Sequence, residues 1–491
     1  MKLTQKLGYG VGQVSDGAKN AAFSTFLFFY YNQVLGLSAS LAGAAALLAL
    51  VVDAITDPMI GQMSDRLRSR FGRRHPFMLA AVVPYFFAMI ALFSPPEDLS
   101  QYQLFGWMLG CGVAVRFALT LFFVPHLSLG AELVKDYHQR TSLIGYRVAF
   151  TYFGILVVSV VGFGVFFPAS QDYPNGLLNA ASYPGFGLFC GVLGAVAMLI
   201  TILSTRWVIP NLTQPPKNLA KKNPLLAVQE VFRTLKIHSF RNLFTVTLLF
   251  TSLAGVVQTL MVYVATYVFE FSSGQLAGLA STFVVGLLFA SIVAQKLSRR
   301  FDKRFALGLC VTLGALTGFA PVTVFLLGLL DGVAVNPKFA FVCAMTGLSQ
   351  IFFIAYLILL DSMLTDVIDE NQMLSGEREE GLFFAARAFA TKASFGVGSF
   401  AAGISLDVIS FPKNASLDTI TPEVVNSLAM LAGPFMLLLF VSTVFISRRY
   451  PLDKKRHNDI VAAIEAGRVD EHSEQQERAN PVSGNVLAEQ A

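Results

Sequence analysis

Two aspartates lie four residues apart in an apolar stretch of the chain, VVDAITDPMIG. On a helix, residues at this spacing share one face, so Asp53 and Asp57 are expected to be neighbours. Two carboxylates in a medium of low dielectric constant repel each other, so one should hold a proton or both should share a cation. Thr56 and Thr120 offer further oxygen atoms, which hard cations prefer as ligands. The pattern predicts a site for H⁺ or Na⁺, with both aspartates as metal ligands if the ion is Na⁺.

A structural explanation of the same aspartates stays open. They would then form ion pairs between helices, with Lys19, Arg147 or Lys392 as partners. Ion pairing and cation binding are compatible with each other. The residue types alone do not separate the two uses.

Other ionisable residues also lie in apolar stretches, where a charge is costly and is therefore a candidate for function. Arg147 stays charged and can hold two oxygens at once, and Lys392 should lose its proton or find a carboxylate. Either residue can contact a bound solute or hold a carboxylate. Asp16 and Lys19 are three residues apart and can neutralise each other. Arg116 has no assigned partner, although it can reach toward the outer surface or cap a carboxylate on that side.

The chain around these charges is unusually apolar. Of its 491 residues, 54% are hydrophobic and only 14% are charged, and its mean hydropathy is +0.60. A soluble domain carries roughly 25% charged residues, and a single soluble core stops growing beyond about 300 residues. The composition therefore excludes an ordinary soluble protein and predicts a surface that faces lipid. The four cysteines lie in apolar runs without metal-ligand spacing, and we interpret them as small buried residues.

A bilayer core needs roughly 20 apolar residues per helix, and this rule predicts twelve spans. The first six cover residues 10–36, 40–65, 76–95, 103–131, 143–168 and 184–209. The second six cover residues 242–270, 274–297, 304–330, 337–365, 382–409 and 424–448. The runs are continuous, which favours helices over the short alternating strands of a membrane barrel. We therefore predict an all-α, multi-pass integral membrane protein.

The distribution of lysine and arginine predicts the orientation of these spans. Basic residues gather after the second span, after the eighth span and in the central segment, whereas the loops 96–102, 169–183 and 331–338 contain only Lys338. The basic segments should be cytoplasmic, and so should both termini. We expect the protein in a plasma membrane, the inner membrane if the source is bacterial.

The two basic loops stand at equivalent places in two sets of six spans, as a duplicated transporter fold would have them. We predict an N-terminal six-helix half at residues 1–209 and a C-terminal half at residues 242–450. A cytoplasmic linker, 210–241, joins them, and a charged, largely disordered tail follows at residues 451–491.

The loop after the second span, GQMSDRLRSRFGRR, resembles the loop motif of the major facilitator superfamily. The motif's key positions are occupied by Asp65, Arg66, Arg73 and Arg74, together with a glycine. The resemblance implies a fold of twelve transmembrane helices in two halves, with these charges as a cytoplasmic gate. We further expect acidic residues in and after the tenth span to pair across this gate with the basic loops that follow the second and eighth spans, namely Asp366, Asp369, Glu370, Glu377, Glu379 and Glu380.

Several more segments are similar to the glycoside–pentoside–hexuronide:cation symporter family. They are KLGYGVGQ, FFYYNQVLGLS, DAITDP, VPHLSLGAEL, RTSLIGYR, DSMLTDVIDE and GEREEGLFFAARAFATKASFGVG, and they span nearly the whole chain. The resemblance implies that Asp53, Asp57 and Thr120 bind the coupling cation. Thr56 replaces an asparagine of the family, which leaves H⁺, Na⁺ and Li⁺ open. Arg147 and Lys392 match cavity positions implicated in sugar binding and charge coupling.

The chain departs from this family where galactoside-binding members carry carboxylates that hold the sugar. Those positions are Gly17 and Phe123 here, and a sugar-stacking tryptophan is replaced by Leu127. Galactoside specificity is therefore not implied. His126 is a candidate for polar contacts in the cavity, although a histidine in such a stretch is more often packed or hydrogen-bonded.

These observations predict cation-coupled symport of a sugar or glycoside by alternating access of the two halves. The predicted substrate cavity contains Arg147, Lys392, Asp16, Lys19, Phe123 and His126. We expect no cofactor beyond the coupling cation, no nucleic-acid partner, no enzymatic activity, and function as a monomer.

Two alternatives remain open. Some segments are similar to the animal sodium-dependent lysophosphatidylcholine symporter, and aromatic residues including Phe122, Phe123, Phe383 and Phe384 would suit an acyl chain. The substrate would then be a lysolipid or another amphipathic solute. The second alternative is a membrane sensor that transports nothing and uses the charged tail as its output.

Overall fold

The structure is a computed structural model that describes residues 2–134, 137–171, 173, 175–211, 233–376, 379–415 and 420–464. Within these residues all regular structure is helical, which confirms the predicted all-α class. Most of the predicted linker, residues 212–232, lies outside the described part, and so do residues 465–491 of the predicted tail.

The N-terminal part begins with an interrupted helical stretch. It consists of α1 (Leu3–Val11), α2 (Gln13–Ala21) and two π-helical segments, η1 (Ala22–Leu27) and η2 (Tyr30–Val34). Four long helices and their extensions follow: α3 (Ala39–Arg66), α4 (His75–Leu92), α5 (Gln101–Leu133), α6 (Tyr137–Val161) with η3 (Gly162–Phe166), and then the short turns η4 (Gly176–Leu178) and η5 (Ala180–Ser182). The part ends with α7 (Tyr183–Ser204) and η6 (Arg206–Asn211).

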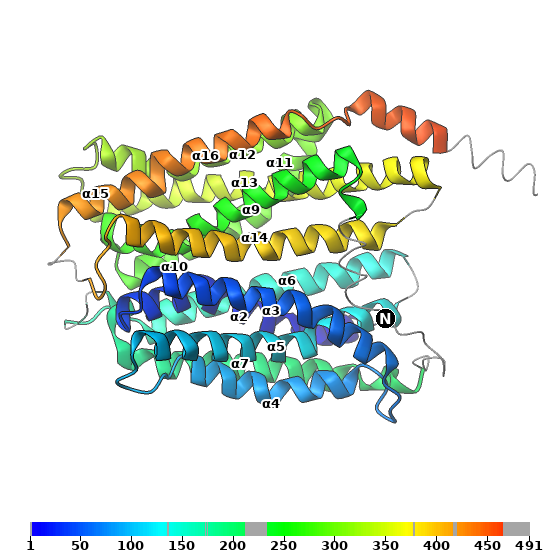
Figure 1. Cartoon of the computed structure of the whole chain (residues 1–491), viewed down its shortest axis with the longest axis horizontal. Helices are drawn as coiled ribbons and strands as arrows, with labels where there is room; N and C mark the ends of the chain where they lie inside the picture. The colour runs from blue at the N-terminus through cyan, green and yellow to red at the C-terminus, as the bar shows by residue number, and fades with distance from the viewer. Residues whose placement is uncertain are drawn as a thin grey trace, which may run out of the picture.

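The C-terminal part repeats this plan. It contains α9 (His238–Tyr263) with η7 (Val264–Val268), α10 (Ser273–Ser281), α11 (Phe283–Arg300), α12 (Lys303–Leu326), α13 (Val335–Ser375), α14 (Glu380–Val408), α15 (Pro422–Met430), η8 (Leu431–Phe435) and α16 (Met436–Ser447). A last described helix covers residues 454–464. In Figure 1 the two parts form two neighbouring bundles, with α3 and α14 facing each other between them.

Ten helices in the described residues are long and apolar enough to cross a membrane. The predicted first and eleventh spans are helical but are not among the ten. The first is broken into short segments and carries Asp16 and Lys19, and α14 carries Arg387 and Lys392. Twelve spans and cytoplasmic termini therefore stay predictions, whereas a multi-pass membrane protein is what the ten apolar helices indicate.

Glycines let the two halves approach each other closely along α3 and α14. A Cβ atom at Gly43 would lie 2.8 Å from the Phe400 Cα atom, and one at Gly396 would lie 2.6 Å from the Leu50 side chain. Small residues at such contacts are typical of membrane helices, which associate by close packing rather than by the hydrophobic effect. The halves also touch where Tyr152 of α6 packs against Phe283 of α11, with ring centroids 5.1 Å apart.

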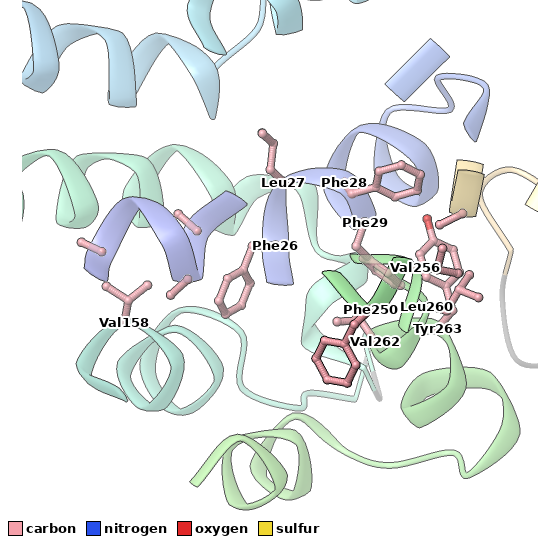
Figure 2. Close-up of a cluster of buried hydrophobic side chains, with 14 of the residues drawn as sticks. Phe26, Leu27, Phe28, Phe29, Val158, Phe250, Val256, Leu260, Val262 and Tyr263 are labelled. Atoms are coloured by element: carbon pink, nitrogen blue, oxygen red, sulfur yellow. The ribbon is translucent and has the colours of Figure 1, made fainter. Parts of the chain in front are cut away.

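Aromatic side chains fill the contact between the first helical stretch and α9. Figure 2 shows Phe28 and Phe29 facing Tyr263, and the ring centroids of Phe29 and Tyr263 are 5.3 Å apart in an edge-on arrangement. Phe26 packs instead toward α6, 4.8 Å from Phe163. Edge-on aromatic pairs of this kind stabilise a buried contact beyond simple area burial. This packing places the polar residues that follow at a joint between the halves.

The helices at this joint end in π-helical segments. η2 ends the first stretch of the N-terminal half, and η7 follows α9, the first helix of the C-terminal half. Both therefore stand at the same place in the two halves. A π segment inserts one extra residue into an α-helical turn and is frequently found at functional sites.

Candidate functional site

Asp53 and Asp57 lie on α3 and face the protein interior. The Asp53 residue is only 7% exposed, and the Asp57 side chain is 24% exposed. Both carboxylates contact α5, as neighbours on one helix face would, and Asp57 also contacts α14. The two side chains therefore do not point toward lipid, an orientation that would rule out a cation site.

Asp53 forms an ion pair with Arg116 of α5. Its Oδ2 atom lies 2.8 Å from Arg116 Nη1, and both side chains are 10% exposed. The Arg116 guanidinium also lies over the Phe23 ring, 5.2 Å from its centroid. Arg116 had no predicted partner, so sequence reasoning missed this pair. The arginine points inward, and the predicted reach toward the outer surface is wrong.

Asp57 binds one group from each half. Its Oδ1 atom accepts a hydrogen bond from Thr120 Oγ1 at 2.8 Å, and its Oδ2 atom pairs with the ammonium group of Lys392 on α14. Lys392 was one of three predicted partners for the aspartates. Because α3 and α14 belong to different halves, the pair of Asp57 and Lys392 is a charged contact across the interface.

Asp16 and Lys19 pair locally on α2, as their spacing predicts. Their charged atoms are 3.3 Å apart. Asn20 joins them by accepting from Lys19 at 2.7 Å and donating to Asp16 at 3.0 Å. The ammonium group of Lys19 also interacts electrostatically with Asp53, Arg116 and Lys392. These electrostatic interactions link the pairs into one group.

We call this group the charge cluster. It contains three acids and three bases, so its formal charge is zero: Asp16, Lys19, Asp53, Asp57, Arg116 and Lys392. Because the bases already neutralise both α3 carboxylates, a bound cation would have to displace a base or a proton. Within the described residues, no group of three or more histidine, cysteine, aspartate or glutamate side chains forms a metal site.

The other predicted site residues lie at varying distances from the cluster. Thr56 donates to the backbone carbonyl of Asp53 at 3.4 Å, within its own helix. Phe123 is partly buried in the core. Arg147 interacts electrostatically with the Tyr9 hydroxyl and the His126 ring instead of with a carboxylate of the cluster.

His126 is fully buried and both of its ring nitrogens are bonded. Nε2 lies 3.0 Å from the Tyr9 carbonyl oxygen, and Nδ1 lies 3.0 Å from Gln13 Nε2. Since a carbonyl only accepts, Nε2 carries the proton and Nδ1 accepts from Gln13. Tyr9 and Phe122 stack on the ring, with centroids at 4.2 Å and 5.2 Å. This environment gives His126 a packing role in the present conformation.

The position of the missing galactoside carboxylate is a helix contact. A Cβ atom at Gly17 would clash with the Thr151 carbonyl oxygen of α6. A Cβ at Gly154 would in turn lie 2.7 Å from the Val14 carbonyl oxygen. The backbones of α2 and α6 are therefore too close for a side chain at position 17.

The predicted gate charges form a network within the N-terminal half. Arg74 lies 2.6 Å from Asp65 and 3.0 Å from Glu132 at the end of α5. Arg73 also pairs with Glu132, at 2.7 Å. Arg66 ends α3. Single exposed ion pairs add little free energy, but Arg74 is only 4% exposed and joins several partners.

The acidic end of α13 pairs with groups of the C-terminal half, and one of them, Lys303, belongs to the basic loop after the eighth predicted span, as expected. Pairing of these acids with the basic loop of the N-terminal half stays a prediction, and Glu377 lies outside the described residues. Lys303 binds Asp366 at 2.7 Å, and the helix at 454–464 contributes His457, 3.4 Å from Asp369, and Arg456, 3.2 Å from Glu370. This helix is thus held by charged contacts at one end. Near its start, burial raises the pKa of the Tyr450 hydroxyl, which stays a neutral donor.

Hydrogen bonds join the two halves at the opposite ends of the helices. Asn32 accepts from Tyr263 at 2.7 Å, and the Oε1 atom of Gln33 accepts from Tyr267 at 2.9 Å and from the Ala415 backbone at 3.1 Å. Gln33 also donates to the Pro412 carbonyl at 3.2 Å. We call Asn32, Gln33, Tyr263 and Tyr267 the outer lock. All four are at most 3% exposed, and sequence reasoning missed them.

Comparison with known proteins adds independent findings. A family model described as MFS/sugar transport protein matches residues 8–454. The chain is 31% identical over 208 residues to an uncharacterized symporter of Synechocystis sp., a match that covers 41% of this chain and 37% of that protein. It is 24% identical to the glucuronide carrier protein homolog of Escherichia coli K12, over 94% of each chain. It is 22% identical to the lactose permease of Lactobacillus delbrueckii subsp. bulgaricus, over 99% of this chain and 77% of the permease.

Solved transporter structures share the fold. The xylose transporter XylE of Escherichia coli, in a partially occluded inward open conformation, aligns with a TM-score of 0.57 at 17% identity, over 92% of this chain and 98% of XylE. A bacterial homolog of the human lysosomal transporter Spinster aligns with a TM-score of 0.59 at 16% identity, over 94% of this chain and 96% of the homolog. At such identities the likeness concerns the fold alone.

Proposed function

The chain belongs to the MFS/sugar transport protein family, and from this we propose that it is a cation-coupled symporter of a sugar or glycoside. The family consists of membrane transporters, so the protein is a transporter and not an enzyme. The relatives include a glucuronide carrier homolog and a lactose permease, and these relatives are bacterial, so a bacterial inner membrane is the proposed location.

One observation carries the proposal: the ion pair of Asp57 and Lys392 connects the two halves. A coupling cation at Asp57 would replace the lysine ammonium as the carboxylate's partner, with Thr120 Oγ1 as a neighbouring oxygen ligand. Releasing Lys392 removes a charged contact between α3 and α14. The ammonium group of Lys392 is then free to bind oxygen atoms of the solute. Binding of the ion is thereby linked to movement of the halves.

The charge balance of the cluster explains why ion and solute should depend on each other. Adding one positive charge to a neutral cluster of low exposure is unfavourable unless a base moves away or a proton leaves. If solute binding favours that displaced arrangement, then the cation must favour solute binding by the same factor. A tenfold coupling needs only about 1.4 kcal/mol. The coupling ion is Na⁺ or H⁺, since carboxylate oxygens suit both.

The outer lock is proposed to control which side of the protein is open to the solute. With the lock closed, the solute path would open toward the cytoplasm, and breaking the lock would open the outer side. Alternating access then consists of exchanging the outer lock for contacts at the gate. We propose that a single chain is the transport unit.

The substrate is proposed as a sugar or glycoside that is bound without the galactoside-type carboxylate contact. The packing of α2 against α6 leaves no room for a side chain at Gly17. Two of the four aromatic residues that suggested the lysolipid alternative give it no support. Phe122 and Phe383 are fully buried: Phe122 stacks on His126 and Phe383 packs edge-on against Phe240 at 4.9 Å. They line no path in this conformation.

The proposed function is tested by uptake into membrane vesicles that contain the protein. Labelled monosaccharides, disaccharides, glycosides and glucuronides are offered under an imposed Na⁺ gradient, an imposed pH gradient, or neither. We expect at least one of these solutes to accumulate above its outside concentration with one gradient only. Equal uptake with and without gradients would reduce the protein to a passive carrier, and uptake of lysolipids alone would favour the alternative substrate class.

Gln33→Ala is expected to shift the protein toward an outward-open conformation. The substitution removes three hydrogen bonds across the halves, each worth about 1 kcal/mol net. A total of about 3 kcal/mol corresponds to a rise of the open population by roughly 100-fold. Spin labels at the exposed outer-loop positions Glu97 and Asp331 would report the change as a longer distance in pulsed electron resonance.

Gln101→Ala is the matched control for this measurement. Gln101 is also an amide at the outer end, but it bonds the Gly36 carbonyl and the Ser38 amide within the N-terminal half. Its replacement should leave the distance distribution unchanged. If both variants behave like the wild type, the outer lock does not control the conformation.

A further inference from the structure

A groove outside the charge cluster lies between α12 and α16. It has a volume of about 360 Å³ and is lined by Arg304, Gly308, Leu309 and Val444, among others, with Arg448 at its polar end. α12 begins and α16 ends at this place, beside the basic loop that the distribution of charges predicts to be cytoplasmic. The groove therefore sits where a membrane helix leaves the hydrocarbon region for the headgroup region.

Two guanidinium groups stand at the polar end of the groove. Arg448 is exposed and pairs with no carboxylate in the described part of the chain, and it lies over the Phe445 ring, 5.6 Å from its centroid. Arg304 Nε lies 3.7 Å from Asp302 Oδ1, with its side chain 41% exposed. The Asp302 carboxylate also accepts from the backbone amides of Arg304 and Lys454, at 3.0 Å and 3.2 Å. The positive charge of the two arginines is thus only partly neutralised.

The rest of the groove is apolar and reaches the lipid-facing surface. Phe305 and Phe445 beside it are 53% and 62% exposed. A Cβ atom at Gly308 would lie 3.1 Å from the Val444 side chain. The glycine therefore lets α12 and α16 approach each other below the arginines, and the floor formed there is free of charge.

We propose that this groove binds an anionic glycerophospholipid, with its phosphate on Arg304 and Arg448 and an acyl chain along Leu309 and Val444. Guanidinium groups bind phosphate oxygens with paired hydrogen bonds, and basic pockets between membrane helices at the cytoplasmic side suit acidic headgroups. The apolar floor favours a lipid over a free phosphate ion. The site lies in the C-terminal half, and its occupant is independent of the transported solute.

The test is native mass spectrometry of the delipidated full-length protein in detergent. Phosphatidylglycerol and phosphatidylcholine with identical acyl chains are titrated separately. We expect tighter binding of phosphatidylglycerol, and Arg304→Gln/Arg448→Gln should weaken that binding by about 25-fold, at about fivefold per basic residue. Leu309→Trp keeps both arginines but fills the groove, and it should weaken phosphatidylglycerol binding as well.

Arg299→Gln/Arg300→Gln is the matched control, because it removes the same charge from the neighbouring end of α11 without touching the groove. It should retain the affinity for phosphatidylglycerol. Equal loss in both double variants would mean general attraction to a basic surface, and equal affinity for the two lipids would overturn the proposal. If the Leu309→Trp variant binds phosphatidylglycerol as tightly as the wild type, the acyl chain does not lie in the groove. Monodisperse elution of each variant checks that it is folded.

Discussion

Replacing Asp57 by asparagine is expected to abolish accumulation of the solute under a cation gradient. Asparagine keeps the size and can still accept the hydrogen bond from Thr120, but it removes the charge that the cation and Lys392 share. Without that charge, the proposed competition between the ion and the contact of the two halves is lost. Vesicle uptake should fall to the level seen without a gradient, whereas exchange of solute down its own gradient should persist.

Asp361→Asn is the control for this experiment. Asp361 is also an aspartate in an apolar helix and pairs with Arg387 at 2.8 Å, but it lies outside the charge cluster. Its replacement should leave gradient-driven accumulation in place. Full accumulation of the solute by the Asp57→Asn variant would contradict the assignment of Asp57 to the cation site.

Asp53→Asn is expected to lower the stability of the folded protein as well as its transport. Asp53 is the ion-pair partner of Arg116, and both side chains are 10% exposed, so solvent screens the pair weakly. Removing one member of a buried pair leaves an unpaired charge and costs about 3–5 kcal/mol. The thermal unfolding midpoint of the purified protein, followed by intrinsic or dye fluorescence, should drop clearly.

The double variant Asp53→Asn/Arg116→Gln separates stability from transport. With both charges gone, no buried charge is left unpaired, and the unfolding midpoint should return toward that of the wild type. Cation-driven accumulation should stay lost, because the acid of the proposed site is still missing. Recovered accumulation in the double variant would assign Asp53 a purely structural role.

Much of the fold follows from apolar periodicity and length alone. The predicted spans 40–65 and 103–131 correspond to α3 and α5 within a few residues. The tenth span was predicted to end at residue 365, but α13 continues to Ser375. Hydropathy measures the part of a helix inside the bilayer, so the charged extension around Asp366 and Glu370 was not included in the predicted span.

The site was predictable only as far as spacing within one helix determines it. Four residues on a helix place Asp53 and Asp57 on one face, and three residues place Asp16 beside Lys19. The pair of Asp53 and Arg116 joins two helices, and its geometry depends on how α3 packs on α5. Asn32 and Gln33 carried a weak signal, namely two amides at the end of an apolar stretch, but their tyrosine partners come from the other half of the chain.

The extra residue in the π turns of η2 and η7 sets the direction in which the outer lock points. Both segments carry lock residues, Asn32 and Gln33 on η2 and Tyr267 on η7. A π turn holds its extra residue within nearly the same rotation about the helix axis as an α turn, so deleting that residue would restore a regular α-helix and leave the helix beyond it facing almost the same way. The change would fall on the lock residues that lie inside the two turns. The number of residues in these two turns therefore determines which side chains face the other half, a constraint that side-chain chemistry alone does not reveal.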